Sequence, residues 1–205
     1  MDGRIERGRQ LREGRRQQVL AAARRLFGEK GYHAASVSDV IEAAGIARGT
    51  FYLYFESKRA IFDEILDALF VDLKGCMRRI ETGPGAPPFM EQLNENLQNV
   101  FSVLLGDPHT SQILTRTGMG IDADFDRKLM EFYGAVSGLI VRALGSGMSL
   151  GVLRRHDPEI TAQFIMGGVR QVVFQVGIQP PERRPPVPAL VSELLRFSLE
   201  GLLVR

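Results

Sequence analysis

A short run of residues between positions 48 and 54 carries the chemical groups that proteins use to bind DNA. Arginine can donate two hydrogen bonds to one guanine, and hydroxyl groups donate to phosphate oxygens. We expect Arg48 to read a base edge, with a phosphate contact as the alternative, and Gly49 to let the backbone approach the groove closely. The hydroxyl groups come from Thr50, Tyr52 and Tyr54; for Tyr52 the alternative is a ring packed inside the domain.

Two short predicted helices would present these groups to DNA. The first has an apolar face with i, i+3, i+4, i+7 spacing, made of Val37, Val40, Ile41 and Ala44. Ser36 precedes that face and Asp39 follows three residues later, which is the pattern of a helix N-cap, while Gly45 suits a sharp turn. The second helix can pack back on the first through Ile46, Phe51 and Phe55. This arrangement predicts a helix-turn-helix.

The run from Gly31 to Phe62 also resembles the DNA-binding domain of the tetracycline-repressor (TetR) family of bacterial transcription regulators. The resemblance covers about a sixth of the chain, or about a quarter with the preceding helix, and rests on linked features: Gly31-Tyr32, Ser36-Val37, Ala44-Gly45-Ile46, Gly49-Thr50-Phe51-Tyr52, Tyr54-Phe55 and Ser57-Lys58. Ala47 departs from the pattern, because the family usually has a Ser or similar cap there. The resemblance implies that Ser38 can reach DNA and that Lys58 binds a phosphate, at a helix N-terminus that favours anions.

Positive charge is concentrated at the N-terminal end of the chain, where the helix-turn-helix is predicted. The 205 residues carry a net charge of +2, but residues 1–60 hold 12 Lys and Arg against 7 Asp and Glu, a net of +5, and residues 61–205 hold 14 against 17, a net of −3. The alternative is a merely solvated basic arm. Cys76 is the only cysteine, and neither a secretory signal nor an 18-residue apolar run is present, so we expect a cytoplasmic protein without a membrane segment.

The rest of the chain has helical periodicity, which predicts an all-α fold. We expect a flexible basic arm over residues 1–14, a helix-turn-helix DNA-binding domain over 15–60 and a helical ligand-binding and dimerisation domain over 61–205. Whether the arm contacts DNA is left open. The predicted helices span residues 15–30, 57–80, 89–105, 108–117, 122–144, 157–177 and 187–203, with a glycine-rich joint at 145–151.

The C-terminal half is where the family places an inducer pocket and a dimer interface. Residues that could line an apolar pocket with a few polar groups are Phe101, Arg116, Met119, Phe125, Tyr133 and Arg170. Apolar residues of the last two long helices, which in the family pair with a second subunit, are Phe164, Val172, Phe174, Leu194, Leu195 and Leu199. For each of them the alternative is ordinary core. No histidine or carboxylate group has metal-ligand spacing, and we expect neither a metal, a cofactor nor an enzyme.

The helix-turn-helix predicts a DNA-binding protein, and the family resemblance implies a homodimeric repressor that binds a near-palindromic operator on double-stranded DNA and is released by a small-molecule effector. Two heads would enter successive major grooves about 34–36 Å apart. One alternative is a DNA-binding regulator or activator without a small-molecule inducer, controlled by a protein partner. The other is a helical enzyme with a vestigial head, for which the sequence offers no acid, base or metal set.

Overall fold

A computed structural model describes residues 2–81, 83–116 and 122–202, and within these ranges the chain is entirely α-helical apart from one 3-10 turn and the connecting loops. The all-α prediction is confirmed. The elements are α1 (Asp2–Lys30), α2 (Val37–Ala44), α3 (Arg48–Tyr52), α4 (Lys58–Cys76), α5 (Phe89–Gly106), α6 (Pro108–Arg116), α7 (Ala123–Ser149), α8 (Pro158–Gly177), the turn η1 (Pro181–Arg183) and α9 (Val187–Leu202). None of the described helices is long and apolar enough to cross a membrane.

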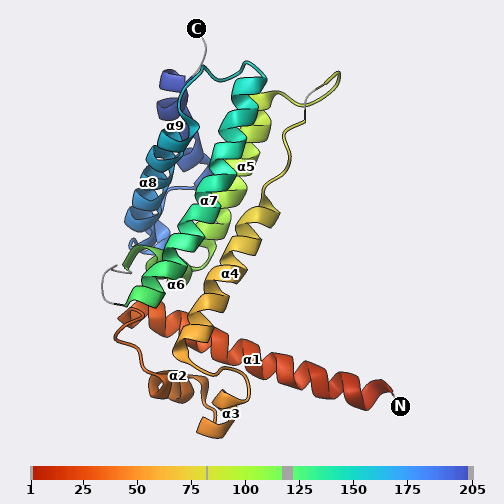
Figure 1. Cartoon of the computed structure of the whole chain (residues 1–205), viewed down its shortest axis with the longest axis vertical. Coiled ribbons are helices and arrows are strands. Elements are labelled where there is room, and N and C mark those ends of the chain that lie inside the picture. Colours follow the sequence, from red (N-terminus) through yellow and green to blue (C-terminus); the bar gives the residue numbers. More distant parts are fainter. Residues whose placement is uncertain (1, 82, 117–121, 203–205) are drawn as a thin grey trace.

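The molecule has a small head and a long helical body (Figure 1). Helices α1, α2 and α3 form the head, and α4 rises from it to pack on α5 and α7. In the body α7 packs on α8, and α5 on α9. Helix α6 lies at the junction, where it contacts α1 on one side and α8 on the other. The head is therefore joined to the body through α4 and through the contact of α1 with α6.

Helix α1 begins at Asp2, so residues that we expected to form a flexible arm continue the first helix. The physical reason is that eight of residues 1–14 are Arg, Glu, Gln or Leu, which have high helix propensity, and none is proline. Gly8 and Gly14 interrupt the pattern, but a helix tolerates single glycines at a cost of about 1 kcal/mol each relative to alanine.

A capping box starts α2, as the sequence predicts. The Ser36 hydroxyl accepts a hydrogen bond from the Asp39 N–H at 3.1 Å, and the Asp39 carboxylate accepts from the Ser36 N–H at 2.8 Å. The Ser36 hydroxyl also donates to the Asp39 carboxylate at 2.7 Å. The bonds that the carboxylate accepts from the Ser36 N–H and hydroxyl, with a further one from Lys30 Nζ at 3.2 Å, lower the pKa of Asp39 from its ordinary value of 3.8 to about 2. Gly45 ends the helix with φ of 61°, the left-handed conformation that its turn requires.

Helix α7 runs through the expected glycine-rich joint and ends at Ser149. Gly147 is buried, and a Cβ atom on it would lie 2.6 Å from Leu153 Cδ1. Gly147 therefore does not break the helix. Its missing side chain lets Leu153, in the chain that follows α7, pack closely on the helix. Whereas α7 is longer than predicted, α4 is shorter: it ends at Cys76, four residues before the predicted end. The chain beyond it is held by amide side chains of α5: Asn96 bonds both the N–H and the carbonyl of Arg78.

Four aromatic rings close the junction between head and body. Phe125 of α7 is fully buried, stacked on Tyr32 at 4.5 Å between ring centroids and 4.5 Å from the Phe62 ring of α4. Phe27 of α1 meets both Tyr32 and Phe62 edge-on. We call these four residues the junction cluster. Because they belong to one continuous core that runs from α1 to α9, head and body are not separate hydrophobic units.

The capping box gives a pH-dependent prediction. We expect wild-type protein to be more stable than the Asp39→Asn variant at pH 6, and the difference to vanish as the pH falls from about 4 to about 2. The folded pKa of about 2 lies below the ordinary value of 3.8, so the stabilisation is complete above the ordinary value and is lost as Asp39 is protonated. Thermal unfolding followed by circular dichroism at pH 6, 4 and 2.5 measures this. A difference that is equal at all three pH values contradicts it.

Candidate nucleic-acid interface

Helix α3 is held on α2 by its apolar side, so that its polar side faces outward. Phe51 is 0% exposed and Phe55 is 3% exposed, and both belong to the core of the head. Arg48 and Gly49 are exposed at the first turn of α3, and Thr50 is half-buried. Ala47 precedes the helix in an extended conformation and makes no side-chain cap, which agrees with the departure noted in the sequence. The first turn of α3 is therefore accessible on the surface of the head.

The side chains of Arg48 and Tyr52 lie together on this outer side. The Arg48 guanidinium carbon is 6.0 Å from the centre of the Tyr52 ring, and that ring meets Phe51 edge-on at 5.2 Å. Tyr52 is still 49% exposed. The sequence predicts that Tyr52 either contacts DNA or packs its ring inside the domain. Its ring does contact Phe51 of the core, but a large part of the side chain remains accessible. A Cβ atom added at Gly49 would meet nothing within 4 Å, so that face of α3 is open to an approaching surface.

The other predicted DNA contacts lie around α3. Ser38 is exposed on the first turn of α2. Tyr54 is half-buried and lines a hollow of about 580 Å³ between α1 and the chain after α3. The same hollow is lined by Arg9 and Arg12, which were not among the predicted site residues. Arg9, Arg12 and Arg16 are spaced by three and four residues, which places them on one face of a helix. This basic face could have been predicted if the stretch had been assigned as helix.

Lys58 has a structural partner that the sequence did not reveal. Its Nζ donates to the carbonyl oxygens of Tyr32 and Ala35, both at 2.8 Å, and lies 4.3 Å from the centre of the Tyr32 ring. Burial lowers the pKa of the Lys58 ammonium group. An ammonium group has three N–H donors, so one remains for a phosphate. Lys58 ties the loop between α1 and α2 to the start of α4, and its phosphate contact stays a prediction.

The predicted effector residues fall in three different places. Phe125 belongs to the junction cluster, and Phe101 is a residue of α5 that is fully buried in the core. Tyr133 lies near both α6 and α8: its hydroxyl donates to the Leu114 carbonyl of α6 at 3.1 Å, and burial raises the pKa of Tyr133 while the neighbouring Arg170 guanidinium of α8 lowers it in part. Met119 and the side chain of Arg116 lie outside the described residues. In the described part, no cluster of His, Cys, Asp and Glu could hold a metal ion.

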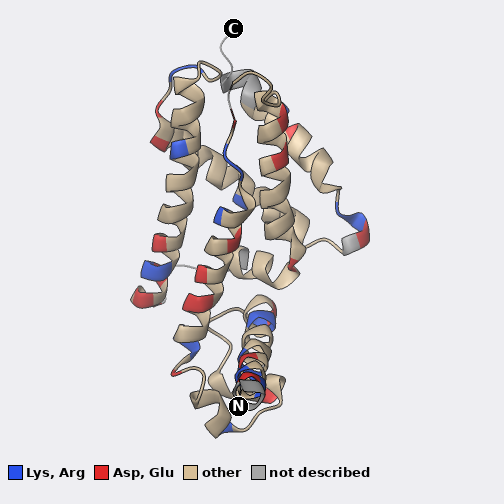
Figure 2. Ribbon diagram, turned by 90° about the vertical axis from the view of Figure 1, so that its right-hand side faces the viewer, with Lys and Arg blue, Asp and Glu red and all other residues tan. Residues whose placement is uncertain are grey.

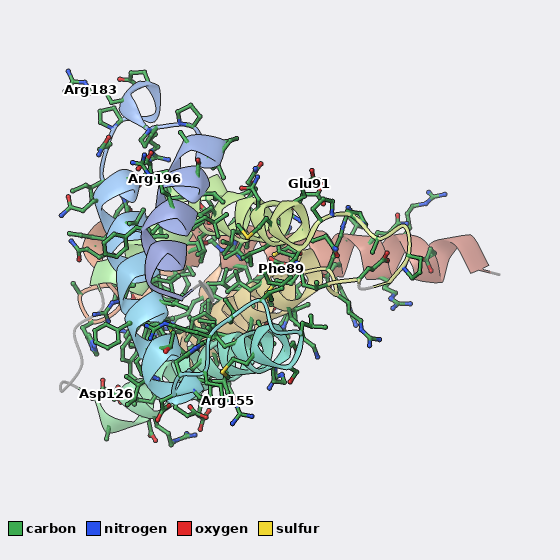
Figure 3. All side chains as sticks on the ribbon, turned by 90° about the horizontal axis from the view of Figure 1, so that it is seen from above. Phe89, Glu91, Asp126, Arg155, Arg183 and Arg196 are labelled. Atoms are coloured by element: carbon green, nitrogen blue, oxygen red, sulfur yellow. The ribbon has the colours of Figure 1, made fainter. Side chains whose placement is uncertain are left out.

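The predicted dimer residues divide into an exposed group and a core group. Phe164 of α8 is 78% exposed, and Phe197 of α9, which sequence reasoning missed, is 83% exposed. Val172, Leu194 and Leu195 are partly buried and pack on the core of their own chain. Phe174 is half-buried, and the side chain of Leu199 lies outside the described residues. Viewed from above, α8 and α9 form one side of the body, opposite the direction in which α1 projects (Figure 3).

Known proteins match this chain at both the sequence and the structural level. Residues 19–65 match the model of the bacterial regulatory proteins of the tetR family. The HTH-type transcriptional regulator YdgC of Bacillus subtilis (strain 168) is 45% identical over 198 residues, which cover 92% of each chain. The fatty acid metabolism regulator protein of the same organism is 29% identical over 189 residues, 90% of this chain and 94% of that one.

Two further matches differ in extent. The HTH-type transcriptional repressor KstR2 of Rhodococcus jostii (strain RHA1) is 44% identical over 69 residues, so the match spans only 34% of each chain. The crystal structure of the transcriptional regulator FadR from Bacillus subtilis in complex with stearoyl-CoA has a TM-score of 0.74 at 22% identity, covering 90% of this chain and 98% of that one. The outward face of α3, the family model and the full-length similarity to YdgC agree, and the chain belongs to the tetR family of bacterial regulatory proteins.

Proposed function

We propose that this protein is a homodimeric transcriptional repressor that binds a near-palindromic operator and leaves it when a small molecule binds to the body. The observation that carries the proposal is the geometry of α3, whose buried Phe51 fixes the helix while Arg48 and Gly49 remain exposed. Residues 15–60 form the DNA-binding unit, and residues 61–205 hold the effector and the second subunit. The relatives' names, which include repressors, support the sign of regulation.

In this proposal each residue of the head has a distinct role. Arg48 reads a guanine, and the absent side chain of Gly49 lets α3 enter the major groove. Thr50, Tyr52 and Ser38 donate to phosphates on either side of the groove. Phosphate donors set the position of the head, and Arg48 supplies sequence choice. Because the dimer has two heads, the operator contains two half-sites about 34–36 Å apart.

Replacing Arg48 by alanine tests the reading of the operator. We expect operator affinity to fall by about 1–3 kcal/mol and the preference to relax at one base pair of each half-site, because the alanine side chain cannot donate to guanine. Fluorescence anisotropy with single-base operator variants measures both effects. Arg155→Ala, an exposed arginine in the loop after α7, is the matched control and should bind as wild type does. A uniform loss over all operator variants would instead make Arg48 a phosphate contact.

The second subunit is proposed to cover the exposed face of α8 and α9. Phe164 of α8 and Phe197 of α9 expose 78% and 83% of their surface, and the burial of these large apolar side chains against a second subunit would be favourable. Both helices lie on the side of the body away from the projecting end of α1 (Figure 3). A two-fold axis across this face would pair each helix with its equivalent, as an isologous dimer requires.

Charge placed on that face should separate the subunits. We expect the double variant Phe164→Glu/Phe197→Glu to be a folded monomer whose operator affinity is at least about tenfold lower, because two heads no longer bind as one unit. Sedimentation velocity gives the oligomeric state and circular dichroism the folding. Val71→Glu, at a 65% exposed apolar residue of α4, is the control and should stay dimeric. A double variant that remains a dimer would move the interface elsewhere.

The effector is proposed to bind near Tyr133 and Arg170, where the partly buried Tyr133 hydroxyl of α7 lies beside the exposed Arg170 of α8. A long-chain acyl-CoA is the first candidate, because a full-length relative is named a fatty acid metabolism regulator and a protein of the same fold binds stearoyl-CoA. Such a ligand has an apolar chain for the helical body and phosphates for an arginine. Since the junction cluster makes one core of head and body, a shift of α7 also moves the head.

Addition of stearoyl-CoA tests this part of the proposal. We expect it to weaken operator binding, and the operator to weaken stearoyl-CoA binding by the same factor. Arg170→Ala should reduce stearoyl-CoA affinity by about tenfold or more, because its charge-assisted bonds are removed, and leave operator affinity without ligand unchanged. Titration calorimetry and anisotropy measure the two affinities. Free coenzyme A is the control for the headgroup alone. If stearoyl-CoA leaves operator binding unchanged, stearoyl-CoA is not the effector, and the protein is controlled by another small molecule or by a protein partner.

A further inference from the structure

The N-terminal part of α1 projects from the head as a basic helix. Residues 6–16 contain five arginines against two glutamates, and almost all of them are exposed. Figure 1 shows this end of α1 extending beyond α4 at the level of α2 and α3, and Figure 2 shows its charged residues when the molecule is viewed from that side. The projection has no role in the core of the head, because the buried residues of α1 begin at Val19.

One face of the projection forms a hollow with the chain that follows α3. The hollow has a volume of about 580 Å³ and is lined by Gly8, Arg9, Arg12, Glu13, Arg16, Leu53 and Tyr54. Its arginines follow the i, i+3, i+7 spacing of one helix face. The hollow therefore combines guanidinium groups of α1 with a tyrosine from the end of the helix-turn-helix.

The inner end of this face is fixed and the outer end is free. Arg16 makes a bidentate ion pair with Glu64 of α4 and lies 5.0 Å from the centre of the Phe55 ring. Within the described part of the chain, Arg9 and Arg12 have no such partner. Glu13 accepts a hydrogen bond from Gln17 Nε2 at 2.8 Å on its own helix. Two unpaired guanidinium groups beside one engaged carboxylate leave the hollow positively charged.

The direction of the projection shows which DNA it can meet. The N-terminal end of α1 points away from α8 and α9 in two perpendicular views (Figures 1 and 3). A second subunit on the face of α8 and α9 would place the two projections on the outer sides of the dimer. They would then lie beside the outer flanks of the operator and not between the two half-sites.

We infer that residues 6–16, with Tyr54, form a second DNA-binding surface that holds the phosphate backbone next to each half-site; this inference rests on the proposed function. Guanidinium and phenol groups donate to phosphate oxygens, and the spacing along one helix face suits a row of phosphates. The two free arginines of this face, Arg9 and Arg12, lie three residues apart, about 4.5 Å along the helix axis, so their long side chains can reach neighbouring phosphates of one strand. The surface adds affinity and footprint without reading sequence.

The test compares two duplexes that contain the operator which the purified protein selects from random DNA. One ends at the outer edge of each half-site, and the other continues for five base pairs on both sides. Wild-type protein should bind the extended duplex at least about tenfold more tightly, and the variant Arg9→Gln/Arg12→Gln should bind both alike. On the extended duplex the variant should lower the slope of log affinity against log salt by about 0.9 for each phosphate that it no longer neutralises.

A matched control separates a local contact from the total charge. Arg142→Gln/Arg155→Gln removes the same charge from the body and should keep the full gain from the flanks. The inference is overturned if wild type gains nothing from the flanks, or if the Arg9→Gln/Arg12→Gln variant gains as much as wild type. Failure of the proposed function is a different result, because the protein would then select no sequence from random DNA.

Discussion

The ring of Phe125, packed between Tyr32 and Phe62, is the contact on which the relation of head to body depends. Phe125 comes from α7 in the body, Tyr32 from the loop before α2, and Phe62 from the second turn of α4. Aromatic pairs at 4.5 Å bury large areas and have preferred orientations, so the head cannot rotate freely without breaking them. A structural change in the body thus reaches the head as a displacement of a packed core.

A second contact strengthens this coupling. Gly28 of α1 lies so near α6 that a Cβ atom on it would be 2.9 Å from His109 Cα. Close by, Arg24 forms an ion pair of 3.5 Å with Asp107, whose carboxylate also accepts from the His109 N–H and caps α6. Because α6 also packs on α8, it connects the first helix of the head with the proposed dimer face. Packed interfaces of this kind change between discrete arrangements and do not deform continuously.

The residues proposed to bind DNA show how one side chain could serve structure and recognition together. Lys58 donates to two carbonyl oxygens and Tyr52 rests on Phe51, so both side chains are positioned before DNA arrives. Arg16, bound to Glu64, similarly fixes the inner end of the basic face of α1. Pre-positioned donors lose less conformational entropy on binding than free ones do. The head is in this sense organised by its core for contact with phosphates.

The helix-turn-helix could be predicted from the amino-acid sequence because its signals are local. The cap of Ser36 and Asp39, the turn at Gly45 and the buried side of α3 each depend on residues within a few positions of one another. The partners of Lys58 and the place of Phe125 became visible only in the folded chain, since their neighbours are distant in sequence and periodicity marks a residue as apolar without naming what it packs on. The length of α1 and the course of α7 through its glycines likewise follow from whole-helix propensity and packing, which outweigh single residues.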